Sequence, residues 1–157
     1  MRVVLTVLAG VVCTAAVVAA RDTKPPAPEK RYGVEADLKA YPQATPKEAL
    51  ASVIKAVEDK RIDYLVAQLT NPDFVDRRVK DTGGDFDGLV REATARLADD
   101  PGPVKRLRRL LEDGDWDVKD ERASVHVKDA KDRWCYFRKD GDRWFLENRY
   151  KPETDEK

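Results

Sequence analysis

The sequence is poor in the side chains that hold metal ions or cross-link a chain. Its 157 residues include one histidine, His126, and two cysteines, Cys13 and Cys135. A structural zinc site takes four nitrogen or sulfur ligands, so we expect no metal site. No glycine-rich phosphate loop, nucleophile elbow or nucleotide fingerprint occurs either. We therefore expect no cofactor.

A surplus of charge of either sign is also missing. The chain has 30 basic and 30 acidic residues, and a balanced charge gives no long-range attraction to nucleic acid. One basic cluster lies on the outer face of an amphipathic segment, as is typical of a solvated helix; it consists of Lys105, Arg106, Arg108 and Arg109. The sequence therefore predicts no nucleic-acid partner.

The longest apolar run stands at the N-terminus. Met1-Arg2 is followed by apolar residues over 3–20, interrupted only by Thr6 and Thr14, and small residues close the run at Ala20. This pattern predicts a secretory signal peptide over 1–20 and an extracytoplasmic protein, periplasmic or secreted. A run of this length could also span a membrane. The alternative is an anchor over 3–20, and we expect membrane association only if the segment is not cleaved.

Cleavage after residue 20 would leave Cys135 as the single cysteine. No intramolecular disulfide could then form, and we expect this thiol to be buried. Residues 21–44 are rich in proline and lack apolar periodicity, which predicts a disordered tether. One domain over 45–151 and a polar tail over 152–157 complete the predicted organisation.

Helical periodicity dominates the first part of this domain. Thr45-Pro46-Lys47-Glu48 combines an N-cap, a proline and a capping-box glutamate, and predicts a helix over 46–59. Apolar residues at helical spacing predict further helices over 62–70, 86–98 and 103–112. Asn71-Pro72 ends the second helix. Residues 74–79 are compatible with a short strand or an irregular link.

From Trp116 onward the apolar period changes to two. The segments 123–127, 133–138 and 143–150 predict an antiparallel meander of three strands, with 116–118 as a possible fourth. Asp140-Gly141 is a strong hairpin signal. The predicted fold class is α+β, with N-terminal helices packed on a C-terminal, three- to four-stranded, cone-like sheet.

Turn positions predict which side chains share a face of this sheet. A turn at Asp140-Gly141 places Phe137 opposite Trp144, and a loop over 129–132 places Val127 opposite Trp134. One face then carries Val125, Val127, Trp134, Tyr136 and Phe145, and the other carries Cys135, Phe137, Trp144 and Leu146. Both faces are apolar, so both need cover. Helices cover one; the curled domain edge, a small apolar ligand or a second copy in a homodimer covers the other.

Three short motifs suggest a family. They are Thr45-Pro46-x-x-Ala49-Leu50, Lys60-Arg61-Ile62-Asp63, and the stretch from Lys139 to Leu146 around the hairpin. Over about residues 45–150 the chain resembles the nuclear-transport-factor-2-like superfamily of cone-shaped α+β domains, and looks most like its small exported members of unassigned function. The resemblance implies a cone, but such cones include both enzymes and non-catalytic modules.

Two functions follow as expectations. The first is a non-catalytic exported module that binds a partner, a second copy or a small apolar ligand. The alternative is a lyase or isomerase, whose acid or base would sit in an apolar pocket that shifts its pKa. The weak candidates for that role are His126, Asp73, Asp76 and Glu147.

Overall fold

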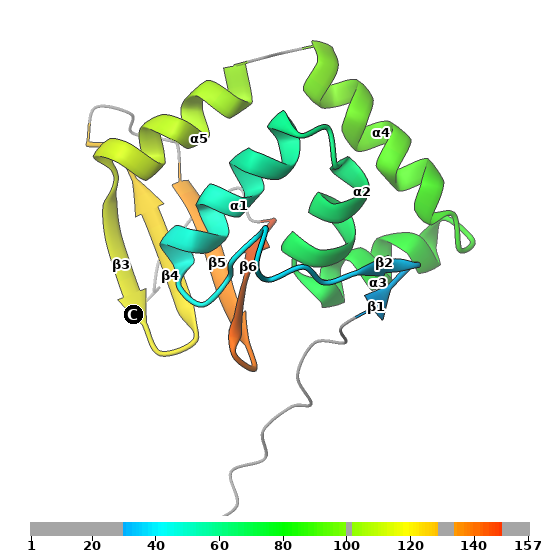
Figure 1. The fold of residues 1–157 in the computed structure, drawn as a ribbon, viewed down its shortest axis with the longest axis horizontal. Coiled ribbons are helices and arrows are strands. Elements are labelled where there is room, and N and C mark those ends of the chain that lie inside the picture. Colours follow the sequence, from blue (N-terminus) through cyan, green and yellow to red (C-terminus); the bar gives the residue numbers. More distant parts are fainter. Residues whose placement is uncertain (1–29, 100–101, 129–133, 149–157) are drawn as a thin grey trace, which may run out of the picture.

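The computed structural model describes residues 30–99, 102–128 and 134–148 (Figure 1). The predicted signal peptide or anchor over 1–20, the segment 21–29 and the polar tail lie outside these residues. Five α-helices and one π-helical segment precede a four-stranded antiparallel sheet in the described part of the chain. The predicted α+β class is confirmed.

Helix α1, Pro46–Glu58, is built as its sequence predicts. The Thr45 hydroxyl accepts a hydrogen bond from the backbone N–H of Glu48 at 3.1 Å. The Glu48 carboxylate accepts one from the backbone N–H of Thr45, also at 3.1 Å. These reciprocal bonds satisfy two donors that a helix start leaves open. The inward stripe includes Leu50 and Val53, which are buried.

The second predicted helix is present but changes type along its length. It starts as α2, Ile62–Tyr64, and continues as the π-helical segment η1, Leu65–Leu69. At its end, the Thr70 backbone N–H and hydroxyl both donate to the Leu65 carbonyl, at 3.0 and 2.9 Å. Such π-helical turns are rare and often lie at functional sites.

The segment expected to be a strand or an irregular link is a helix. Helix α3 runs over Pro72–Asp81, with Asn71 as its N-cap, whose side chain accepts from the Phe74 N–H at 3.3 Å. Both alternatives for 74–79 are therefore wrong. The Asn-Pro pair that ends one helix also starts the next, because asparagine favours the N-cap and proline the first helical position.

The remaining predicted helices are confirmed with small changes in their bounds. Helix α4 covers Phe86–Asp99 and helix α5 covers Gly102–Asp113. The sheet follows, with β3 at Asp115–Lys119, β4 at Arg122–His126, β5 at Trp134–Asp140 and β6 at Arg143–Glu147, side by side in that order. The possible fourth strand is thus present, as β3.

Both predicted registers are corrected. In the β5–β6 hairpin Asp140 pairs with Arg143 and Phe137 with Leu146, two residues from the predicted pairing, so each side chain keeps its predicted face. Between β4 and β5 the shift is one residue. Val125 pairs with Cys135, and His126 with Trp134. A one-residue shift moves every side chain of β4 to the opposite face.

The inner face of the sheet is the one that α1 and α5 cover (Figure 1). It carries a buried cluster shared with Leu50 and Leu110 of these helices, namely Ala123, Val125, Cys135, Phe137 and Trp144. The outer face carries Ser124, His126, Trp134, Tyr136 and Phe145. Because α1 and α5 occupy the inner face, α2, η1, α3 and α4 gather beside the sheet.

The domain begins before Thr45. A hairpin of β1, Lys30–Arg31, and β2, Val34–Glu35, packs against the helices. The Arg31 guanidinium pairs with Asp76 of α3, and Tyr32 stacks on Phe86 of α4 with ring centroids 4.4 Å apart. The predicted tether is therefore wrong for residues 30–44, because polar and aromatic contacts replace the apolar periodicity that it lacks.

None of the helices in the described ranges is both long enough and apolar enough to cross a bilayer.

Candidate ligand-binding site

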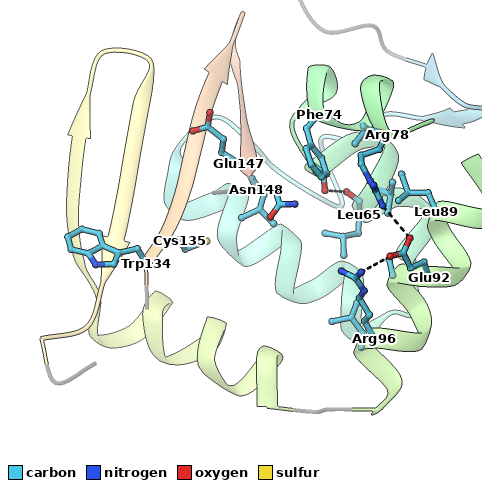
Figure 2. A pocket seen from close by; sticks show the side chains of 16 residues that line it. Leu65, Phe74, Arg78, Leu89, Glu92, Arg96, Trp134, Cys135, Glu147 and Asn148 are labelled. Carbon is cyan, nitrogen blue, oxygen red and sulfur yellow. Dashed lines mark hydrogen bonds and ion pairs between the residues drawn. The ribbon is translucent and has the colours of Figure 1, made fainter. Parts of the chain in front are cut away.

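A groove of about 670 Å³ opens beside the sheet, between the ends of β5 and β6 and the helices η1, α3 and α4 (Figure 2). It forms because α1 covers only part of the inner face, and α4 packs on α2 and α3 rather than on the sheet. The volume lies within the range typical of small-molecule sites. The fold therefore leaves a preformed space of ligand size.

The walls of this groove are mainly apolar. The apolar part of the helical wall consists of Leu65, Val66, Phe74, Val75, Leu89, Ala93 and Leu97, and the sheet contributes Cys135 and Leu146. Leu89, Ala93 and Leu97 pack at the edge of a buried cluster of α2, η1 and α3, and they are only half-buried because they also border the groove. Apolar side chains left partly wet on a concave surface favour an apolar ligand.

Three charged side chains stand on the helical wall. The Arg96 Nη2 lies 2.6 Å from the Glu92 Oε1, and the Arg78 Nη2 lies 3.5 Å from the Glu92 Oε2. One carboxylate from α4 thus lies between one guanidinium of its own helix and one of α3, as Figure 2 shows. These groups give an otherwise apolar groove a polar edge.

Two residues contribute to the sheet wall without turning their side chains inward. In Figure 2 the indole of Trp134 and the carboxylate of Glu147 point away from α3 and α4, whereas Cys135 and Asn148 point toward them. The register agrees, since Trp134 pairs with His126 and Glu147 with Tyr136 on the outer face. The inward polar group of this wall is the Asn148 side chain.

The Cys135 thiol in the groove wall is expected to be unreactive. Cys135 is 7% exposed, and its burial is confirmed. Burial in apolar surroundings raises the pKa of the Cys135 thiol to about 12, because the thiolate loses its hydration. Since the thiolate is the nucleophilic form, the protonated Cys135 thiol contributes an apolar surface to the groove and does not act as a nucleophile at neutral pH.

A buried polar cluster supports η1 from behind the groove. The Arg143 guanidinium donates from Nε and Nη2 to the Gln43 Oε1, at 3.1 and 2.7 Å. Its Nη2 also donates to the Gln68 carbonyl at 3.0 Å and to the Gln68 Oε1 at 2.9 Å. Burial lowers the pKa of Arg143. Because Gln68 belongs to η1, the cluster fixes the segment that presents Leu65 and Val66 to the groove.

The predicted acid–base candidates lie in different places. His126 stacks on Trp134 on the outer face, with ring centroids 4.1 Å apart. Asp73 lines a small hollow beside Arg138, 4.0 Å away, and Asp76 binds Arg31 and Tyr32. Glu147 borders the groove with its carboxylate turned outward. The structure does not bring these four residues into one cavity.

The predicted ligand or dimer face is divided by the corrected register. Trp134, Tyr136 and Phe145 share the outer face, but Val125 is buried on the inner face, and Val127 packs with the same inner cluster. Val125 and Val127 therefore do not share a surface with Trp134 and Tyr136, and Phe145, which is 1% exposed, is not open either. Whether that surface binds anything stays a prediction.

Sequence reasoning missed the groove itself. The apolar spacing over 86–98 predicted the helix, but it could not show that Leu89, Ala93 and Leu97 border a groove instead of packing on the sheet. Arg78 fell in a segment whose helix was not predicted, so its position opposite Glu92 could not be foreseen.

Comparison with known proteins adds no assignment. No protein-family model matches the chain, and no curated protein or solved structure matches it. The resemblance to the nuclear-transport-factor-2-like superfamily therefore stays a prediction. Within the described ranges, no three His, Cys, Asp or Glu side chains cluster in a way that could hold a metal ion. Fold and site together define an α+β protein with an apolar groove between its helices and its sheet.

Proposed function

We propose that this protein is a non-catalytic module that binds a small apolar ligand in the groove between α4 and the ends of β5 and β6. The observation that carries the proposal is a space of about 670 Å³ with mainly apolar walls. Burying apolar surface there is worth about 25 cal/mol per Å². Part of this gain offsets the lost freedom of the ligand, so we expect a dissociation constant on the order of 10 µM.

The arrangement of the titratable groups favours binding over catalysis. General acid–base chemistry needs a group within hydrogen-bonding reach of the reacting atom. His126 and the Glu147 carboxylate lie on the outer face, and the Cys135 thiol stays protonated. The carboxylate that does line the groove, that of Glu92, is paired with the guanidinium groups of Arg78 and Arg96. The alternative of a lyase or isomerase has no comparable observation in its favour.

Filling the groove tests the proposal. In Ala93→Trp an indole would occupy the space from the α4 wall, and we expect it to weaken binding of the neutral fluorophore N-phenylnaphthylamine by more than about tenfold, because an occupied pocket cannot bury the probe. Ala95→Trp is the matched control, since Ala95 lies on the same helix, is exposed and does not line the groove. Fluorescence titration of the full chain measures both.

The proposal fails if the wild-type chain does not bind the probe, or if the two tryptophan variants weaken binding equally. Urea unfolding of each variant shows whether Ala93→Trp keeps the native fold. If it does not, Leu97→Lys, which puts a charge on the same wall, replaces it with the same expected loss.

A further inference from the structure

The charge facing the groove is unbalanced. Arg78 and Arg96 share a single carboxylate, that of Glu92. The fourth charged residue of the lining is Glu147, which lies opposite Tyr136 in the β5–β6 register. Its carboxylate points to the outer face of the sheet. Two cations and one anion therefore border the interior of the groove, and its helical edge carries a net positive charge.

The hydrogen-bonding groups that remain unused at this edge are N–H donors of positively charged side chains. A guanidinium carries five N–H donors and no acceptor. The Arg96 Nη2 donates a hydrogen bond to the Glu92 carboxylate. The Arg78 Nη2 forms an ion pair with the same carboxylate at the longer distance of 3.5 Å. The side chain of Arg96 is 72% exposed, so further N–H groups are open to a ligand. Guanidinium groups favour planar, two-oxygen acceptors such as carboxylates.

We propose that the ligand is an amphiphile whose apolar chain ends in a carboxylate. Its chain lies along Leu65, Leu89 and Leu146, and its carboxylate binds Arg78 and Arg96 at the mouth. The inference rests on the proposed function, because it names the class of molecule that the same groove takes. An apolar wall next to one surplus positive charge is complementary to such a molecule.

Displacement of N-phenylnaphthylamine by decanoate and by decanol, which differ in the head group, tests this inference on the full chain. In Arg96→Gln we expect decanoate to bind about three- to fivefold more weakly, the loss usual for a partly exposed ion pair, and decanol to bind as before. Glu92→Gln should tighten decanoate by a similar factor, because it removes the competing carboxylate.

Arg91→Gln is the matched control. Arg91 lies on the same helix, its side chain is also 72% exposed, and it pairs with Asp85 away from the groove. It should leave both ligands unchanged. Added salt should weaken decanoate and not decanol, because ions screen an exposed charge pair.

The possible failures can be told apart. If Arg96→Gln and Arg91→Gln weaken decanoate equally, or if Arg96→Gln changes decanol as much as decanoate, the inference is overturned while the groove remains a binding site. If neither ligand displaces the probe and the probe itself does not bind, the proposed function falls with it.

Discussion

Gln43 joins, through its side-chain hydrogen bonds, parts of the domain that lie far apart in the sequence. Its amide donates to the carbonyls of Gln68 at 3.1 Å and of Trp144 at 2.8 Å, and its Oε1 accepts from Arg143. This guanidinium donates to the side-chain oxygens of Gln43 and Gln68 and to the Gln68 carbonyl, which are all neutral acceptors. A buried cation of this kind is stable only while its neutral partners are in place.

Gln43→Leu should therefore lower the free energy of unfolding by about 2–4 kcal/mol, because it removes the acceptor shared by Nε and Nη2 of a buried guanidinium and leaves Nε without a partner among the hydrogen bonds described. Urea denaturation measures the loss. The double variant Gln43→Leu/Arg143→Met should lose less than the sum of the two single variants, since the two side chains are coupled. Additive losses, or a loss below about 0.5 kcal/mol for Gln43→Leu, would contradict this account of the cluster.

The Cys135 thiol gives a second test at the same scale. With a pKa of about 12 and little exposed surface, it should react with a disulfide reagent slower than the unfolded chain by on the order of a thousandfold. The measurement uses Cys13→Ser, which leaves one thiol. Equal rates in native buffer and in denaturant would show that the groove wall is open at Cys135.

At the scale of elements, the junction of α5 with β3 depends on a glycine. A Cβ on Gly114 would lie 2.2 Å from the Leu110 carbonyl oxygen and 2.3 Å from the Val125 Cγ2. Neither neighbour is the end of a flexible chain, so the helix and the sheet would have to separate.

Gly114→Ala should accordingly destabilise the fold by about 1–3 kcal/mol, the usual effect of overpacking. The neighbouring Asp113→Ala, at an exposed position, should change stability by less than about 0.5 kcal/mol. Thermal unfolding compares the two variants. Equal effects would mean that α5 does not pack on Val125 as described.

Local sequence patterns predicted most helices and strands, whereas the register between strands depends on the tertiary structure. Thr45 and Glu48 predict the start of α1, because the capping interactions lie within one helical turn. The β4–β5 register could not be predicted in the same way, because it depended on an assumed loop over 129–132. An error of one residue in the length of that loop moves every side chain of β4 to the other face of the sheet. Helix α3 was missed because Asn71-Pro72 signals both an end and a beginning.

The groove lies beyond what such patterns can predict. Its α4 wall has the apolar period of a helix packed on a core, and nothing in that period shows that α4 rests on α2 and α3 instead of on the sheet. The position of Arg78 beside Glu92 depends on two helices meeting, which is a property of the fold and not of either segment.

At the scale of the whole molecule, the N-terminal hairpin closes the helical side. Arg31 binds both Asp76 and the Pro72 carbonyl, and Tyr32 stacks on Phe86. The domain therefore starts by residue 30. Cleavage after residue 20 and a homodimer stay predictions. With the corrected register, a dimer through the sheet would use the outer face around Trp134 and Tyr136.

The account rests on the groove as the site of binding, and a nuclear magnetic resonance titration tests this most directly. Isotope-labelled full chain is titrated with N-phenylnaphthylamine while the backbone amides are followed. The account predicts saturable shifts at Leu65, Ala93 and Leu146, with Ser124 on the outer face unchanged. Shifts confined to the outer face, or no saturation up to the solubility of the probe, would contradict it.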